Sequence, residues 1–179
     1  SLDRQLDLVV RSDGSVRTRV LLDSGEAEAT TAAATVTTGA WHHVAATWNG
    51  SALAIVVDGT IRASVVTIGA IAPRNQMPVH LGNVATQDRG LDGLLDEVRF
   101  ETVARSVDWL AAAETNQRTP GSFFVVGGVE SGTWFGQGTW AYRKPVVVDS
   151  DLVSTDLFDF ALMVQVTDAR LQATAQPCA

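Results

Sequence analysis

The sequence predicts an all-β protein built as an antiparallel sandwich, and three features of the 179-residue chain support this. Residues 41–48 alternate between two faces, as they do in a strand that buries one side. The pairs Asn49-Gly50 and Asp58-Gly59 supply residues that tolerate the positive φ angles of two-residue hairpin turns. The run Leu53–Val57 between them is short, apolar and partly β-branched. Two turns in succession predict a meander of three antiparallel strands.

The residues before this meander predict two strands and a further strand at the edge of a sheet. Leu6–Val10 is a short apolar run that ends at the turn residues Ser12-Asp13-Gly14. Val16–Leu22 follows with clear alternation, and Asp23-Ser24-Gly25 predicts another turn. Residues 26–38 are mostly alanine and threonine, a composition that also permits helix. The alternation within this run favours an edge strand followed by a loop.

Two further strands are expected after a surface connection at residues 68–76. Val79–Leu81 is a short apolar run, and Leu91–Phe100 is a longer one with Leu94 on its apolar face. The polar segment Gly82–Gly90 separates them. We therefore predict two strands joined by an exposed loop.

One short helix is predicted at residues 107–116. Ser106 is a suitable N-cap, and Asp108 places a negative charge in the first turn. The residues expected to pack are Trp109, Leu110 and Ala113. Thr119-Pro120-Gly121 is expected to end the helix, which we interpret as a lid or a link and not as a catalytic element.

Several motifs stand in the order typical of laminin-G/concanavalin A-like jelly-roll domains. They are Trp41, His43-Val44-Ala45, Thr47-Trp48, Asn49-Gly50, Val57-Asp58-Gly59, Leu81-Gly82 and Leu91-Asp92-Gly93-Leu94-Leu95-Asp96-Glu97-Val98-Arg99. The chain from Leu6 to Leu110 resembles this family, which implies jelly-roll topology and an extracellular role. Family members usually have further strands before the point where this sequence begins, so the resemblance implies either an incomplete N-terminal part or strands that are supplied from elsewhere.

The composition changes after Pro120. Residues 121–139 are rich in glycine, with aromatic residues between the glycines, and predict a linker that packs in places. New strands are expected at residues 140–149 and 160–167. So few strands cannot cover their own apolar faces.

The same C-terminal part resembles the start of a domain of unknown function that occurs beside laminin-G-like modules in bacterial surface proteins. The resemblance rests on Tyr142-Arg143-Lys144 and on Thr167-Asp168-Ala169. The expected organisation is therefore a laminin-G/concanavalin A-like domain, a glycine-rich linker, and a partial second β domain or a set of donated strands. Their bounds are residues 1–120, 121–139 and 140–179.

Charge and composition exclude some classes of function. The net charge of -7 and the absence of a lysine or arginine run argue against a nucleic-acid partner. No apolar run approaches the roughly 20 residues of a membrane-spanning helix, and no signal peptide is visible. The single cysteine, Cys178, excludes a disulfide within the chain. A disulfide to another chain is the alternative to an unpaired thiol.

The histidines do not predict a metal site. His42 and His43 are adjacent and point to opposite faces of a strand, so they cannot share one ion. His43 is interpreted as a packed residue whose ring bonds a neighbouring carbonyl, and His80 as a structural residue. Zinc is not expected.

The carboxylates near the end of the first domain raise the question of glycoside hydrolysis. Glu97 and Glu101 share a face of the predicted strand, as a retaining hydrolase requires. The third acidic residue that sandwich hydrolases of related fold place between such a pair is replaced by Arg99. We interpret the group as a salt-bridged outer face and predict no enzymatic activity.

The polar loop at residues 82–90 is the predicted binding site. Its candidate ligand-binding residues are Asn83, Gln87, Asp88 and Arg89. The resemblance implies calcium at the rim of the sandwich, and the carboxylates of Asp88 and Asp92 would suit this hard cation. Surface carboxylates without a metal are the alternative interpretation.

The sequence thus predicts a non-catalytic binding or adhesion module of a secreted or cell-surface bacterial protein. Its expected ligand is a glycan or an extracellular protein. The alternative is a structural subunit of an extracellular filament that self-associates through residues 140–179 by strand addition.

Overall fold

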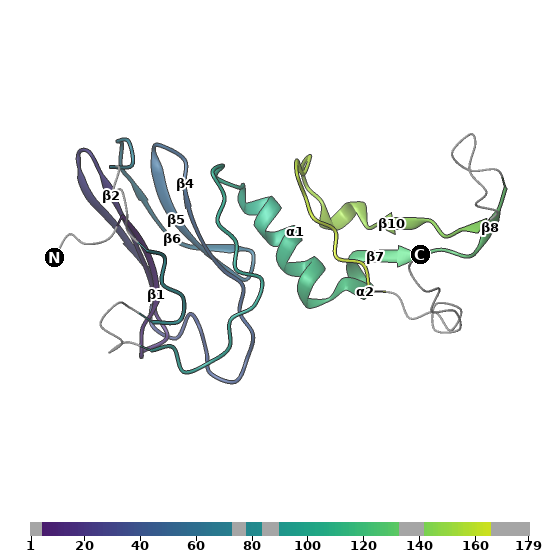
Figure 1. Ribbon diagram of the computed structural model, residues 1–179, viewed down its shortest axis with the longest axis horizontal. Helices are drawn as coiled ribbons and strands as arrows, with labels where there is room; N and C mark the ends of the chain where they lie inside the picture. Colours follow the sequence, from purple (N-terminus) through teal and green to yellow (C-terminus); the bar gives the residue numbers. More distant parts are fainter. Residues whose placement is uncertain (1–4, 73–77, 84–89, 133–141, 166–179) are drawn as a thin grey trace. The chain divides into compact units, whose positions relative to one another are not determined.

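A computed structural model describes residues 5–72, 78–83, 90–132 and 142–165 of the chain. Backbone contacts divide the protein into two compact units, Ser1–Arg105 and Ser106–Ala179. Strands β1 to β6 belong to the first unit, and the helices and the strands β7 to β10 belong to the second (Figure 1).

The first unit contains two antiparallel three-stranded sheets. The first sheet has the order β1-β2-β3, with β1 at Leu6–Val10, β2 at Val16–Leu22 and β3 at Gly25–Thr30. The second sheet has the order β4-β5-β6, with β4 at Val44–Trp48, β5 at Ala52–Val57 and β6 at Thr60–Val66. The predicted antiparallel sandwich and its three-stranded meander are confirmed, although the meander starts at Val44 and not at Trp41.

The apolar core lies between these two sheets, because alternate residues of a strand point to the same side. β2 and β3 supply one wall of the core and β5 the other. The buried members are Val16, Val20, Leu22, Ala27, Ala29, Leu53, Ile55 and Val57. The polar side chain of Thr18 is also fully buried, and its hydroxyl donates to the carbonyl of Asp7 at 2.8 Å. Its burial therefore leaves no donor unsatisfied.

The two hairpin turns of the second sheet differ in construction. Asp58 and Gly59 both have positive φ, 50° and 70°, as the predicted type of turn requires. In the other hairpin the central residues are Gly50 and Ser51, and only Gly50 has positive φ. Asn49 lies one position earlier than predicted, and its Oδ1 accepts hydrogen bonds from both the N–H and the hydroxyl of Ser51.

The strands predicted at Val79–Leu81 and Leu91–Phe100 are wrong: the structure shows no strand in these segments. Their apolar side chains are largely exposed, Leu94 at 78% and Phe100 at 67%. A strand forms only where a neighbouring strand accepts and donates backbone hydrogen bonds, and alternation alone does not provide that neighbour. Glu97 also has a φ of 50°, which interrupts an extended backbone.

The second unit begins with helix α1, Val107–Arg118, as predicted. The Ser106 hydroxyl accepts a hydrogen bond from the N–H of Trp109 at 3.2 Å, so the predicted cap is confirmed. A short helix α2 follows at Pro120–Phe123. Two antiparallel strand pairs complete the unit: β7 (Phe124–Val126) with β10 (Val146–Val148), and β8 (Glu130–Ser131) with β9 (Tyr142–Arg143). Among the described residues no helix is both long and apolar enough to cross a bilayer.

Part of the segment predicted as a linker is packed. Phe123 and Phe124 are buried and form a small core with Ala112 of α1. The strand predicted at residues 140–149 is interrupted in its described part at Lys144-Pro145, where proline offers no backbone donor. The strand predicted from Phe160 does not form within the described residues up to 165. The bounds of the domains themselves stay a prediction.

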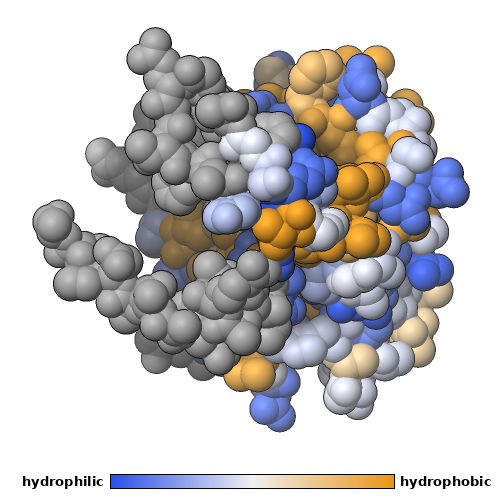
Figure 2. Space-filling model, turned by 90° about the vertical axis from the view of Figure 1, so that its right-hand side faces the viewer, coloured by the Kyte–Doolittle hydropathy of each residue, from blue (hydrophilic) through white to orange (hydrophobic). Residues whose placement is uncertain are grey.

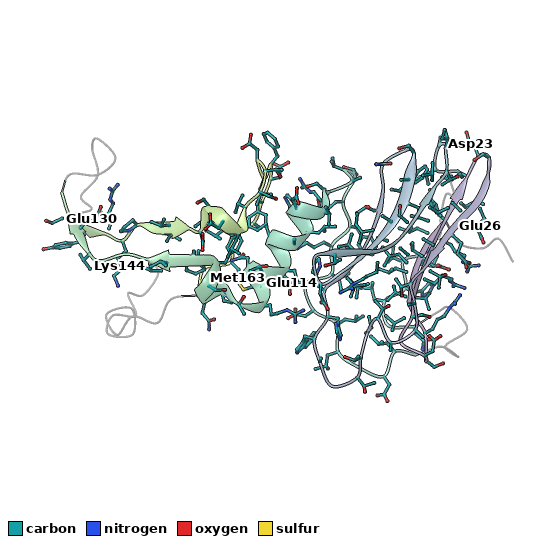
Figure 3. The ribbon with its side chains drawn as sticks, turned by 180° about the vertical axis from the view of Figure 1, so that it is seen from behind. Asp23, Glu26, Glu114, Glu130, Lys144 and Met163 are labelled. Carbon is teal, nitrogen blue, oxygen red and sulfur yellow. The ribbon has the colours of Figure 1, made fainter. Side chains whose placement is uncertain are left out.

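The segment around Met163 is held against α1 by side-chain hydrogen bonds. Asn116, only 1% exposed, donates from Nδ2 to the Met163 carbonyl at 3.0 Å and accepts the Met163 N–H at 2.7 Å. Trp109 donates from Nε1 to the carbonyl of Phe158 at 3.2 Å, and its ring meets that of Phe160 edge to face at 5.4 Å. Figure 3 labels Met163 beside this helix. One carboxamide therefore satisfies both polar groups of a residue that has no strand partner.

These contacts bear on the filament alternative. Strand addition would require the C-terminal part to leave its own chain. Val148 and Phe160 instead pack with Phe123 and Phe124 of the same chain. Residues 166–179 lie outside the described part of the chain, so the filament alternative stays a prediction.

The Asn116 contact generates a test. Asn116→Ala should release the segment around Met163, because it removes the side chain that bonds both the N–H and the C=O of Met163. Hydrogen exchange at the Met163 amide should accelerate roughly tenfold, the equivalent of about 1.4 kcal/mol. Gln117→Ala, on the more exposed side of α1, is the control and should leave exchange unchanged. Equal exchange in the two variants would show that Asn116 does not hold this segment.

Candidate functional site

The predicted rim loop lies mostly outside the described residues. This applies to three of its candidate residues, Gln87, Asp88 and Arg89. Asn83 is half-buried and Asp92 is exposed. The N–H of Leu91 donates to the carbonyl of Gly82 at 2.7 Å, which brings the two ends of the loop together. The binding role of this loop stays a prediction.

The calcium site also stays a prediction, because Asp88, one of its two proposed ligands, is not described. In the segments that the structure describes, no group of three or more His, Cys, Asp or Glu side chains is placed to hold a metal ion. Cys178 lies outside those segments.

The carboxylates considered for hydrolysis form ion pairs. Glu97 Oε2 lies 2.9 Å from a guanidinium nitrogen of Arg99, and Glu101 pairs with Arg105. The ion pair between Glu97 and Arg99 agrees with the predicted salt-bridged surface. The strand that would have placed Glu97 and Glu101 on one face is absent. The geometric argument for a carboxylate pair therefore no longer applies.

One end of the sandwich is closed by residues 31–43, which we call the anchored loop because hydrogen bonds fix it at both ends. Its first part is bound to the turn between β1 and β2. The N–H of Ala34 donates to the Asp13 carbonyl at 2.8 Å, and that of Val36 to the Gly14 carbonyl at 2.9 Å. A Cβ at Gly14 would lie 2.4 Å from the carbonyl oxygen of Val36, so the close approach requires glycine.

The last part of the anchored loop is bound to the turn between β5 and β6. His42 Nδ1 lies 2.8 Å from Asp58 Oδ2, and Asp58 Oδ1 accepts the N–H of His43 at 3.0 Å. His42 Nε2 accepts the N–H of Thr37 at 3.2 Å. Because Nε2 accepts, the proton of the neutral ring is on Nδ1, which donates to Asp58. One carboxylate and one imidazole thus connect two parts of the loop to the second sheet.

The contacts in this group join an acid, a base and a hydroxyl in the order of a catalytic triad, namely Asp58, His42 and Thr37. The Thr37 hydroxyl oxygen lies 3.0 Å from His42 Nε2. A catalytic base must direct its lone pair at the proton of the nucleophile. Here the backbone N–H of the same threonine shares that nitrogen. We therefore interpret the group as a structural connection.

Trp41 stands in the anchored loop immediately before His42. Its exposed fraction is 60%, in contrast to 6% for Trp109. Thr37 and Thr38, in the same loop, are also exposed. Residues 29–41 contain no charged side chain, although the chain as a whole carries a net charge of -7. This stretch of the loop therefore presents an indole ring and hydroxyl groups and carries no charged side chain of its own.

Sequence reasoning missed this group of residues. It considered His42 only as a metal ligand and Asp58 only as a turn residue. The hairpin register contained a usable signal, since pairing of Val44 with Val57 places His43 next to Asp58. A carboxylate in a turn beside two histidines could therefore have been predicted to form hydrogen bonds across the hairpin.

Other apolar side chains are exposed in both units, for example Val66 at 82% and Phe158 at 74%. Figure 2 shows hydrophobic surface, in orange, between hydrophilic patches on the face turned to the viewer. Exposed apolar residues cover much of any protein surface and do not by themselves define a site. Trp41 differs because hydrogen bonds fix the loop that carries it.

The carboxylate of Asp58 can be tested without changing its turn. Asp58→Asn keeps a residue type that tolerates positive φ. The NH₂ group of asparagine replaces one of the two accepting oxygens, so the N–H donor that bonded to that oxygen loses its acceptor. The free energy of unfolding of the chain should fall by about 1–3 kcal/mol in urea denaturation. Asp92→Asn, at an exposed position, is the control. A loss no larger than that of the control would contradict the anchoring role.

The turn between β1 and β2 predicts a pH dependence. Hydrogen bonds from the hydroxyl and the N–H of Ser15 lower the pKa of Asp13 below its ordinary value of 3.8. The resulting stabilisation is complete above the unfolded-state pKa and is lost as the pH falls through the lower folded-state pKa. Asp13→Asn keeps an acceptor but cannot titrate, so below pH 3.8 it should lose less stability than the unchanged protein. Identical acid unfolding curves would refute this.

Comparison with known proteins agrees with the sandwich fold. Residues 3–111 match the sequence profile of the concanavalin A-like lectin/glucanases superfamily. No curated protein matches the chain. The crystal structure of an S-layer domain-containing protein from Clostridium thermocellum, residues 221–444, is similar with 19% identity and a TM-score of 0.39. That similarity covers 64% of this chain and 59% of the other, so the chain spans less than two thirds of it. By the extent of the profile match, the chain belongs to the concanavalin A-like lectin/glucanase superfamily.

Proposed function

We propose that the first unit is a non-catalytic binding or adhesion module of a secreted or cell-surface bacterial protein, and that its ligand is a glycan or an extracellular protein. The superfamily name joins lectins, which bind sugars, and glucanases, which cleave them. One fold hosts many functions, so the choice between binding and cleavage depends on the site.

The anchored loop is the observation that carries this proposal. Binding residues on sandwich folds commonly lie on loops that a rigid scaffold positions. Here the bonds to Asp13, Gly14 and Asp58 fix the loop before any ligand arrives. A fixed loop loses little conformational entropy on binding, which favours affinity.

The carboxylates favour binding over hydrolysis. A retaining glycosidase needs two carboxyl groups about 5 Å apart, one of them protonated. Glu97 and Glu101 are each paired with an arginine, and the strand that would place them on one face is absent. This pairing supports a non-catalytic role for the segment.

The loop at residues 82–90 is proposed as a second part of the binding surface, with calcium held by Asp88 and Asp92. Both carboxylates would offer the oxygen ligands that calcium prefers. Asp92 is exposed in the structure and so is accessible to such an ion.

A binding screen tests the proposal. The full chain, labelled on lysine, is applied to neutral and acidic polysaccharides and to extracellular matrix proteins, with calcium or with EDTA. We expect binding to at least one immobilised ligand with no release of reducing sugar from any polysaccharide. A weaker signal in EDTA would support the calcium site, and an equal signal would argue against it. Sugar release that Glu97→Gln abolishes, or binding to no ligand, would overturn the proposed function.

A further inference from the structure

The hydrogen bonds of His42 suit only one protonation state of its ring. Nε2 accepts the backbone N–H of Thr37 at 3.2 Å, so this nitrogen carries no proton. Nδ1 lies 2.8 Å from Asp58 Oδ2 and carries the proton of the neutral ring. An imidazole ordinarily gains its second proton between roughly pH 5 and 8, and here that proton would go to Nε2. Two donors, the Thr37 N–H and the new Nε2–H, would then face each other.

The two contacts of the ring respond to this proton in opposite directions. The Asp58 carboxylate remains an acceptor and attracts the charged ring more strongly than the neutral one. The Thr37 N–H loses its acceptor, because a protonated Nε2 has no lone pair. The Thr37 hydroxyl oxygen, 3.0 Å from Nε2, can accept the new N–H, but it does not replace the acceptor that the backbone N–H has lost. Protonation therefore releases the backbone at Thr37 and keeps His42 bonded to the turn between β5 and β6.

One other titratable group around the anchored loop changes charge in the same pH range. His43 follows His42, and its N–H bonds to Asp58 Oδ1, so its ring must be followed separately. Carboxylates such as Asp58 ordinarily stay charged above about pH 5. At the other attachment of the loop, hydrogen bonds from Ser15 and the charge of Arg11 lower the pKa of Asp13 below 3.8.

The first part of the anchored loop is attached by bonds that do not titrate. The N–H groups of Ala34 and Val36 donate to backbone carbonyls of the turn between β1 and β2. Neither a backbone N–H nor a backbone carbonyl changes its protonation in this range, so these bonds persist in acid. The change is confined to residues 37–41, the segment that contains the exposed Trp41.

We propose that His42 is a proton-sensitive switch in the anchored loop. The neutral ring fixes the backbone of Thr37 to the turn between β5 and β6, and the protonated ring releases it. Residues 37–41 are thus ordered at neutral pH and loosened in mild acid. The switch itself does not require a ligand. Its consequence for binding, a lower affinity in acid because the ligand must then order the loop, rests on the proposed function.

Nuclear magnetic resonance of the isotope-labelled full chain tests this inference without a ligand, across the pH range in which imidazoles titrate. The ring nitrogens report their own protonation, and a scalar coupling through the N–H···N hydrogen bond reports the contact between Thr37 and His42. We expect this coupling at the upper end of the range, and we expect it to disappear with the same midpoint as the protonation of His42. Protection of the Thr37 amide from exchange should fall about fivefold, as for one hydrogen bond of ordinary net strength. Protection at Ala34 and Val36 should not change.

Two histidine variants control for other effects of acid. His42→Gln keeps a donor and an acceptor in the side chain but does not titrate, so the protection of the Thr37 amide should no longer depend on pH. His80→Gln removes an exposed histidine outside the loop and should leave the pH dependence as it is in the unchanged chain. The scalar coupling is measured in the unchanged chain and so does not depend on the folding of either variant.

The outcomes separate the switch from the proposed function. A proton on Nε2 at the upper end of the pH range, or a His42 ring that gains no second proton within it, would overturn the switch. A Thr37 amide that keeps its protection, or that follows the titration of His43, would also overturn it. None of these results concerns ligand binding. A screen that finds no ligand would overturn the proposed function and leave the switch.

Discussion

The first unit depends on the apolar contact between two small sheets. Val16 and Val20 of one sheet and Leu53 and Ile55 of the other are almost completely removed from water. Each sheet has only three strands and could not bury an apolar face alone. Packing the two faces together excludes water from both, and this contact determines where the turns and loops must lie.

Polar bonds close the two ends of this sandwich in different ways. At one end the anchored loop is held by the Asp58 carboxylate and the His42 ring. At the other end the backbone after β6 runs beside the turn between β2 and β3, where Asp23 exchanges hydrogen bonds with Ala70. Figure 3 labels Asp23 at this turn and Glu26 in the following strand β3. Among the described residues of this unit, the exposed Trp41 lies in the loop at the first end, which is where we propose ligand binding.

Short polar side chains replace strand partners at several places in the molecule. Asn116 bonds both backbone groups of Met163, Asn49 closes a hairpin turn, and Asp58 accepts a backbone N–H beside its own turn. Each of these side chains bonds backbone donors or acceptors at a place where the hydrogen bonding between strands does not continue. They allow irregular segments to be ordered, and one such segment, the anchored loop, carries the surface on which the proposed function rests.

The sequence by itself determined the local elements and the fold class. Asp58-Gly59 specified its turn because both residues accept positive φ, and Ser106 specified the start of α1 because its hydroxyl caps the first turn. Alternation correctly identified β2 and β4, short apolar runs between turn residues identified β1 and β5, and the motif order identified the superfamily. These features depend on a few adjacent residues and can therefore be read directly from the chain.

Only the tertiary structure decided which alternating runs find a partner and which side chains remain exposed. Leu91–Phe100 has the pattern of a strand, but it forms no ladder with any strand among the described residues. The association of His42, Asp58 and Thr37, and the exposure of Trp41, follow from how the loop crosses between the sheets. Pairing and burial are properties of residues that are distant along the chain, so no local pattern could determine them.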